Sequence, residues 1–148
     1  MLELDLIQTR GFHNIRKNGK ITGFQFNVRL TYYRGIFLSQ LRPKKVTVDG
    51  EVYENDQVIW SLNGTDYTCE EMEKRGDVHW NPLDVMTIKI EKEGGLPAGY
   101  HEISAAYMYS SSYMPPKLQA GIDGDEISPF MEMMFGQLHS TRKLLLVQ

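Results

Sequence analysis

Apolar and polar residues alternate along most of this chain with a period of two. Every second side chain is apolar between Phe24 and Leu30, and the same alternation recurs in Met86–Ile90, Ile103–Tyr109 and Leu2–Leu6. Successive side chains of a β-strand point to opposite faces of its sheet, so each segment is predicted to be a strand with one buried face. The continuous apolar run Leu144–Val147 predicts a last strand that is buried on both faces.

Three dipeptides predict tight turns between such strands: Asn18-Gly19, Asp49-Gly50 and Asn63-Gly64. A type I′ turn needs positive φ at both central positions, which these residue types tolerate. The first turn would join a strand at 12–16 to one that begins near residue 21. The second would join 45–48 to 51–53, and the third would join 58–62 to 66–67. Hairpins so close together indicate the all-β class, with residues 1–148 as one antiparallel β-sandwich or jelly-roll-like domain.

Two segments depart from the strand pattern. A short helix is predicted after Thr68, because Glu71 can complete a capping box and Gly76 suits a left-handed helix exit. Residues 110–140 are predicted to form a long irregular loop. The apolar stretch Met131–Phe135 in this loop would be covered either by the domain itself or by a partner protein.

Charge and composition narrow the possible partners. A net charge of −3 over 148 residues argues against a nucleic-acid partner. The largest basic cluster, Arg42–Lys45, is predicted to be a turn and a solvated strand start. The single cysteine, Cys69, allows neither an intrachain disulfide nor a zinc site of several thiolates. With no signal-peptide pattern and no apolar run of ~18 residues, we expect a cytoplasmic protein without a membrane partner.

No catalytic group of residues emerges from the sequence. Asp77 and His79 would share a strand face as two possible metal ligands, but no third ligand accompanies them. The carboxylates of the segment Asp123–Glu126 lack the spacing of a calcium loop. Cys69 lies at the first turn of the predicted helix, where the helix dipole could lower its pKa, but no histidine is placed beside it. We therefore assign no catalytic residue, metal ligand or cofactor to this chain.

Two aromatic motifs, Tyr32-Tyr33-Arg34-Gly35 and Tyr113-Met114-Pro115-Pro116, are candidates for a contact surface. Tyrosine and arginine supply flat apolar area with polar tips, which suits sugars and protein partners alike, and prolines reduce the entropy lost on docking. Each motif also has a purely structural interpretation. The first could be a strand end whose tyrosines pack on the rim of the core, and the second could be a stiff exit from the strand Ile103–Tyr109. The predicted contact or pocket-edge residues are Tyr32, Tyr33, Arg34, Tyr113, Met114, Pro115 and Pro116.

Taken together, four segments resemble the β subunit of bacterial C-glycoside deglycosidases. They are Tyr32–Ser39, Val46–Gly50, Ser112–Pro116 and Thr141–Leu144. Their order and approximate spacing match over most of Gly11–Pro116, with a second match at the C-terminus, and Lys117–Ser140 is not matched. The resemblance implies a small β-sandwich subunit that pairs with a TIM-barrel α subunit holding a divalent metal, typically manganese. The complex would cleave the C–C bond between sugar and aromatic aglycone in 3-oxo C-glucosides, usually those of flavonoids.

The resemblance also implies a lyase mechanism. The 3-keto group acidifies the proton on C2, a base removes it, and the aglycone leaves by elimination while the metal polarises the ketone oxygen. In this interpretation the chain is a non-catalytic subunit that supports or closes the active site of the α subunit.

The alternative is a stand-alone carbohydrate-binding or protein-interaction β-sandwich module. Trp60 and Trp80 could stack on a sugar ring if both were exposed on one sheet face, although tryptophans are more often buried. A third possibility, an independent enzyme with a β-barrel fold, would need a ligand cluster that the sequence does not display.

Overall fold

The computed structural model describes residues 5–32, 34–109 and 139–147. The residues predicted to form the loop 110–140 lie outside this part, except for His139 and Ser140, which open the last strand. The elements are β1 (His13–Lys17), β2 (Lys20–Arg29), β3 (Ile36–Phe37), η1 (Leu38–Gln40), β4 (Leu41–Pro43), β5 (Val46–Val48), β6 (Glu51–Tyr53), η2 (Asn55–Gln57), β7 (Val58–Leu62), β8 (Thr65–Thr68), α1 (Cys69–Glu73), β9 (His79–Trp80), β10 (Val85–Glu91), β11 (Gly99–Tyr109) and β12 (His139–Leu146).

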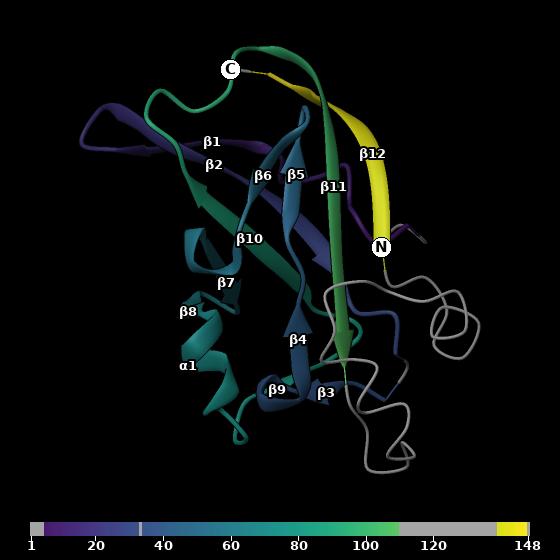
Figure 1. Ribbon diagram of the computed structural model, residues 1–148. Coiled ribbons are helices and arrows are strands. Elements are labelled where there is room, and N and C mark those ends of the chain that lie inside the picture. The colour runs from purple at the N-terminus through teal and green to yellow at the C-terminus, as the bar shows by residue number, and fades with distance from the viewer. Residues whose placement is uncertain (1–4, 33, 110–138, 148) are drawn as a thin grey trace.

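The strands form two larger antiparallel sheets and one small one. The first sheet has the order β1-β2-β10-β7-β8, and the second has the order β12-β11-β5-β6, with β4 also pairing with β11. β3 and β9 form a separate ladder of two residue pairs. Strands β2 and β10 cross obliquely behind β11 and β5, so the two sheets face each other (Figure 1). This confirms the predicted all-β, sandwich-like fold.

The core lies between the sheets and follows the period-two pattern. Phe24, Phe26 and Val28 of β2 are fully buried, as are Ile103 and Tyr107 of β11. Removing a large apolar side chain from water stabilises the fold by about 1.5–3 kcal/mol. The alternation therefore selects the face that each strand turns inward.

The three predicted tight turns are confirmed. Asn18, Asp49 and Asn63 have φ values of 52°, 51° and 51°, and the glycine after each also has positive φ. The turns connect β1 to β2, β5 to β6 and β7 to β8. Local turn chemistry thus sets the register of three hairpins.

The predicted helix forms, but its end was placed too late. Thr68 Oγ1 accepts a hydrogen bond from Glu71 N, and Glu71 Oε1 accepts one from Thr68 N, each at 3.1 Å, which confirms the capping box. Helix α1 ends at Glu73, and Gly76 does not adopt positive φ. The chain leaves the helix early because backbone hydrogen bonds tie it to η1: Leu38 N donates to Val78 O and Ser39 N to Arg75 O.

The last strand also corrects the sequence prediction. Strand β12 is buried on one face only, since Leu144 and Leu146 are buried whereas Leu145 is 50% exposed. Strand β12 is an edge strand, and only one of its two faces meets the core between the sheets. At the other end, Leu6 and Ile7 are buried, but they form only an isolated bridge from Ile7 to Val28. Residues 2–4 of the predicted strand Leu2–Leu6 lie outside the described part, so that strand stays a prediction.

Among the described residues, no helix has the length and apolar character needed to cross a membrane.

Candidate partner-contact site

The predicted contact residue Tyr32 lies against the end of β11. Its ring stacks on that of Tyr109 with 5.1 Å between centroids and 27° between planes. Arg34, two residues on, is exposed. Tyr33, Tyr113, Met114, Pro115 and Pro116 lie outside the described residues, so their predicted contact role stays a prediction. The structure thus places Tyr32 on the rim of the core, where its ring extends an aromatic cluster.

This aromatic cluster continues inward through two tyrosines and a tryptophan. Tyr109 lies 6.4 Å from Tyr107 between ring centroids, and Tyr107 lies 5.5 Å from Trp80. The Tyr107 hydroxyl accepts a hydrogen bond from Thr31 N at 2.9 Å and donates one to Arg29 O at 2.8 Å. Burial raises the pKa of Tyr107 to about 12 and also raises the pKa of Tyr109. Both phenols therefore stay neutral, and the Tyr107 hydroxyl holds the end of β2 in place.

Close packing at Gly35 joins β3 to β9. Gly35 has a φ of +75°, and a Cβ at this position would lie 2.4 Å from His79 Cε1 and 2.7 Å from Trp80 O. Only glycine combines this conformation with this approach. The neighbouring ladder sets Phe37 opposite His79, whose ring meets the Phe37 ring edge-on at 5.1 Å. The Phe37 side chain is still 43% exposed.

A rigid turn presents a second apolar side chain directly after β9. Asn81 Oδ1 accepts a hydrogen bond from Leu83 N, Asn81 O accepts one from Asp84 N, and Trp80 Nε1 donates to Asp84 O, each at 2.9 Å. Leu83 is 84% exposed, the highest value among the large apolar side chains of the described residues. Backbone and side-chain hydrogen bonds thus fix the turn that carries it.

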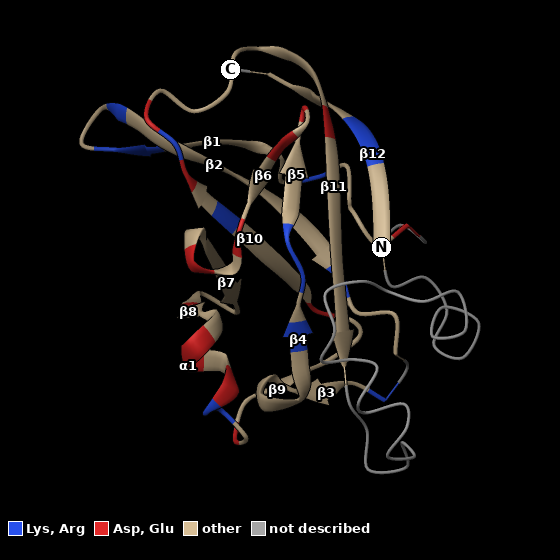
Figure 2. Cartoon of the chain, viewed as in Figure 1, with Lys and Arg blue, Asp and Glu red and all other residues tan. Residues whose placement is uncertain are grey.

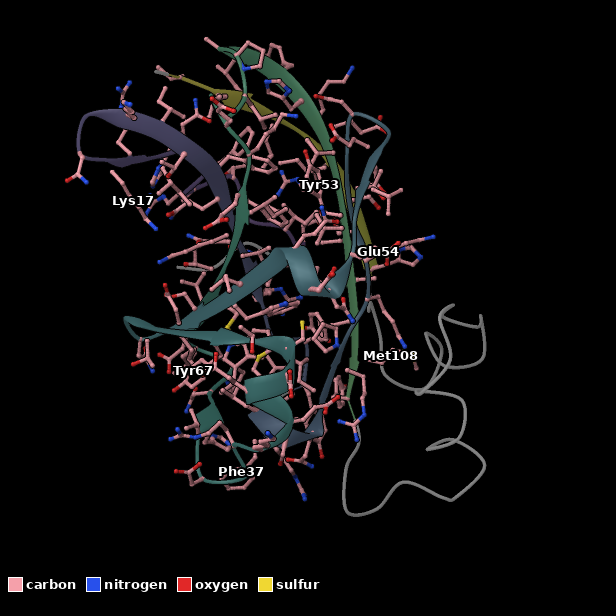
Figure 3. The ribbon with its side chains drawn as sticks, turned by 60° about the vertical axis from the view of Figure 1, so that its left-hand side comes forward. Lys17, Phe37, Tyr53, Glu54, Tyr67 and Met108 are labelled. Atoms are coloured by element: carbon pink, nitrogen blue, oxygen red, sulfur yellow. The ribbon has the colours of Figure 1, made fainter. Side chains whose placement is uncertain are left out.

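We call this surface the aromatic end, defined by Tyr32, Arg34, Phe37, His79 and Leu83. Strands β3 and β9, which carry Phe37 and His79, lie at the lower end of the molecule (Figure 1), and Figure 3 shows Phe37 below Tyr67 and Met108. Sequence reasoning singled out Tyr32 and Arg34 but missed the other three. The signal available was Gly35, because a glycine after two tyrosines and an arginine indicates a close backbone approach at that point.

A groove of about 610 Å³ lies elsewhere, between β4, η2 and α1. Its lining includes the basic residues Arg42, Lys44 and Lys45 and the acidic residues Glu54, Asp56 and Glu73. Figure 2 shows the blue segment of β4 and the red segments of α1, the two charges that line this groove. Here the structure corrects the interpretation of Arg42–Lys45 as a turn and strand start, because Leu41–Pro43 is itself a strand paired with β11. The opposed charges offset one another, so the groove favours neither anionic nor cationic ligands.

Cys69, which also lines that groove, is not an activated thiol. Burial raises its pKa to about 11, and the Glu73 carboxylate adds to this effect. The expected lowering by the helix dipole does not prevail, because burial and the Glu73 and Asp56 carboxylates favour the protonated thiol and α1 is only five residues long. The thiol is therefore protonated at neutral pH.

The remaining candidates for chemistry are engaged in holding the fold. Asp77 does not share a strand face with His79, because it precedes β9 and its carboxylate accepts two hydrogen bonds from Arg75 at 2.9 and 3.1 Å. Across residues 5–32, 34–109 and 139–147, no three His, Cys, Asp or Glu side chains gather as metal ligands. Trp60 and Trp80 are 1% and 0% exposed. Their expected burial is confirmed, and they do not form an exposed sugar platform.

Comparison with known proteins identifies one family. The family model for the C-glycoside deglycosidase beta subunit matches residues 2–113. The C-glycoside deglycosidase beta subunit of Eubacterium cellulosolvens is 46% identical over 149 aligned positions, which cover 99% of this chain and 100% of that protein. The 3'-dehydrocarminate deglycosidase beta subunit of a Microbacterium species is 31% identical over 94 positions, covering 64% of this chain and 70% of that protein. The matched residues include the whole aromatic end.

Proposed function

This chain belongs to the family of C-glycoside deglycosidase beta subunits, and we propose that it is the non-catalytic subunit of a heteromeric carbon–carbon lyase. In this proposal the complex cleaves the bond between sugar and aromatic aglycone in 3-oxo C-glucosides. The companion α subunit is a TIM barrel that holds a divalent metal, and manganese is the ion we expect. The single cysteine, Cys69, suits the cytoplasmic location that we propose for the complex.

The observation that carries this proposal is the match of residues 2–113 to the family model, together with a relative that is 46% identical over nearly the full chain. The described residues support the division of labour. A metal of this kind takes carboxylate and imidazole ligands, and no three such side chains gather in the described part of the chain. We therefore assign the metal, and the base that removes the C2 proton, to the α subunit.

The aromatic end is the surface that we assign to the α subunit. Interface cores favour aromatic, methionine and arginine side chains, and rigid exposed anchors lose little entropy on binding. Phe37 and Leu83 are such anchors, since the first packs on His79 and the second lies on a hydrogen-bonded turn. Tyr32 and Arg34 extend the surface toward the end of β11. Contact here would let the chain support or close one side of the barrel's pocket.

Purification from the native cell tests the proposal. We expect an affinity-tagged chain to co-purify with one protein in stoichiometric amount, identified by mass spectrometry as a TIM-barrel subunit and containing manganese by elemental analysis. The reconstituted pair should release the aglycone from a 3-oxo C-glucoside of a flavonoid, and neither subunit alone should match its rate. A chain that elutes alone and free of metal, and that leaves the barrel's activity unchanged on addition, would refute the proposal.

A further inference from the structure

The four strands at the edges of the two larger sheets differ in how they are protected from pairing with another chain. β6 and β8 are only three and four residues long, and β1 is interrupted by a register shift between Ile15 and Arg16. Short strands and bulges are the usual devices that keep an edge from pairing with another chain. β12 has neither, since it runs for eight residues and pairs with β11 without a register shift. It forms the outer edge of its sheet in Figure 1.

The hydrogen bonds of β11 determine which backbone groups of β12 face outward. Asp49 N donates to Glu102 O and Lys44 N donates to Ala106 O, so the even-numbered residues of β11 turn their backbone groups toward β5 and β4. Backbone direction alternates along a strand, so His101 and Ile103 turn theirs toward β12. Their partners there are Leu144 and Arg142, respectively.

It follows that Lys143 and Leu145 direct their N–H and C=O groups away from β11. Within the part of the chain that the structure describes, no backbone hydrogen bond is made to these groups. Only the start of β12 is tied down on another side, where Ser140 Oγ donates to the Asp5 carboxylate and Arg142 Nη1 donates to Ile7 O. The second half of β12 therefore presents an open row of donors and acceptors.

The same half of β12 carries exposed apolar side chains. Leu145 is 50% exposed, Val147 is 71% exposed, and Tyr100, which pairs with Leu145 across the strands, is 68% exposed. These are three of the six exposed large apolar side chains among the described residues. Figure 1 shows the end of β12 near the C-terminus, far from the β3–β9 ladder of the aromatic end. An apolar corner beside an open strand edge is the pattern expected of strand addition between chains.

We propose that this edge binds a second copy of the same chain, with the two β12 strands antiparallel across a two-fold axis. The outward residues of β12 are the odd-numbered ones, and an antiparallel pair of identical strands brings odd-numbered residues opposite one another in every register that satisfies these groups. One such register sets Leu145 opposite the second copy's Leu145, and the next sets Leu145 opposite the second copy's Lys143. The sheet β12-β11-β5-β6 of each copy then joins that of the other, and one continuous sheet crosses the dimer.

Charge disfavours a further register. A pair centred on Lys143 would oppose two ammonium groups directly, which destabilises a cross-strand pair. Both registers above avoid this contact. Lys143 is also opposite Glu102 on β11, which offsets its charge within each copy. The edge can therefore pair with itself without opposing like charges, and in the register centred on Leu145 the two Leu145 side chains cover each other while Val147 lies opposite the second copy's Lys143.

Cross-linking of the full-length chain tests this proposal. A Leu145→Cys variant places one new thiol at the proposed axis, and a Val52→Cys variant is the matched control. Val52 is 43% exposed and lies on β6, the opposite edge of the same sheet. Cys69 is half-buried with a pKa raised to about 11, so it competes little in either variant. With a short bis-maleimide, we expect Leu145→Cys to form covalent dimers at least about tenfold faster than Val52→Cys.

Sedimentation gives an independent measurement. The unmodified chain should self-associate reversibly, Leu145→Lys should weaken the association at least about tenfold, and Val52→Lys should leave it unchanged. Equal cross-linking of the two cysteine variants, together with a monomer up to about 100 µM, would overturn the proposal. Cross-linking of Leu145→Cys to the α subunit instead, in the reconstituted complex, would also overturn it and would assign the edge to that subunit.

Discussion

His101 Nδ1 lies 2.5 Å from Asp49 Oδ2, in a pair that ties the β5–β6 turn to β11. The other ring nitrogen, Nε2, lies 2.7 Å from Pro97 O. The Asp49 carboxylate and the Pro97 carbonyl both accept hydrogen bonds, so each ring nitrogen of His101 must carry a proton. The geometry therefore favours the doubly protonated imidazolium. Burial alone would lower the pKa of His101, but the hydrogen bonds to Asp49 and Pro97 outweigh it and raise the pKa above its ordinary value.

Stability should therefore fall on both sides of a mildly acidic optimum. The pKa of His101 is raised in the folded state, so its contribution is complete below its unfolded pKa of about 6.5 and is lost as pH rises through the folded value. Burial would raise the pKa of Asp49, but His101 and the Glu102 amide lower it. The Asp49 contribution is present above about pH 3.9 and is lost as pH falls through the folded value. Urea unfolding between pH 3 and 9 measures both losses.

Replacing Asp49 with Asn should reduce this pH dependence while keeping the turn, because only the Pro97 carbonyl would still raise the pKa of His101. Asn tolerates the positive φ of 51° and keeps one oxygen for the Glu102 amide. We expect a loss of about 1–2 kcal/mol near pH 5 that shrinks toward pH 9. Asn63→Asp changes the equivalent turn position and serves as the control. An Asp49→Asn loss that is equally large at pH 5 and pH 9 would contradict the assigned imidazolium.

The features predicted correctly from the sequence are those set by near neighbours in the chain. The Asn-Gly and Asp-Gly turns follow from the φ preferences of two adjacent residues. The capping box follows from Thr68 and Glu71, three positions apart. The β3–β9 ladder could not be predicted, because it joins two residues at 36–37 to two at 79–80 and is too short to show a period. Of the five residues of the aromatic end, the sequence therefore indicated only Tyr32 and Arg34.

Gly35→Ala should destabilise the chain more than a glycine substitution in an open turn. Both Gly35 and Gly19 have positive φ, but an added Cβ at Gly19 meets nothing within 4 Å, whereas at Gly35 it meets His79 and the Trp80 carbonyl. Gly19→Ala should cost about 1–2 kcal/mol from backbone strain alone. The cost of Gly35→Ala should exceed this by at least about 1 kcal/mol, measured by urea unfolding. Equal losses would show that β3 moves freely away from β9.

Cys69 should react slowly with thiol reagents in the folded chain. With a pKa of about 11, only about one thiol in 10³ is ionised at pH 8. A free cysteine, with a pKa of about 8.5, is ionised to about a quarter at this pH. We expect the rate with a disulfide reagent to be about two orders of magnitude below that of the urea-unfolded chain. A folded rate close to the unfolded one would mean that Cys69 is neither buried nor protonated as described.

Substitutions at the aromatic end should weaken binding of the α subunit without unfolding the chain. Phe37→Lys and Leu83→Lys each place a charge on an exposed apolar side chain, so the isolated fold loses little. In the complex each charge would be buried, and we expect the dissociation constant to rise at least about tenfold, or about 1.4 kcal/mol. Val52→Lys alters a residue on β6 that is as exposed as Phe37, and this variant should bind as the unmodified chain does. Calorimetric titration with the α subunit measures all three. Unchanged affinity of Phe37→Lys and Leu83→Lys, with a loss in Val52→Lys instead, would move the contact from the β3–β9 ladder to β6 and leave the family assignment intact.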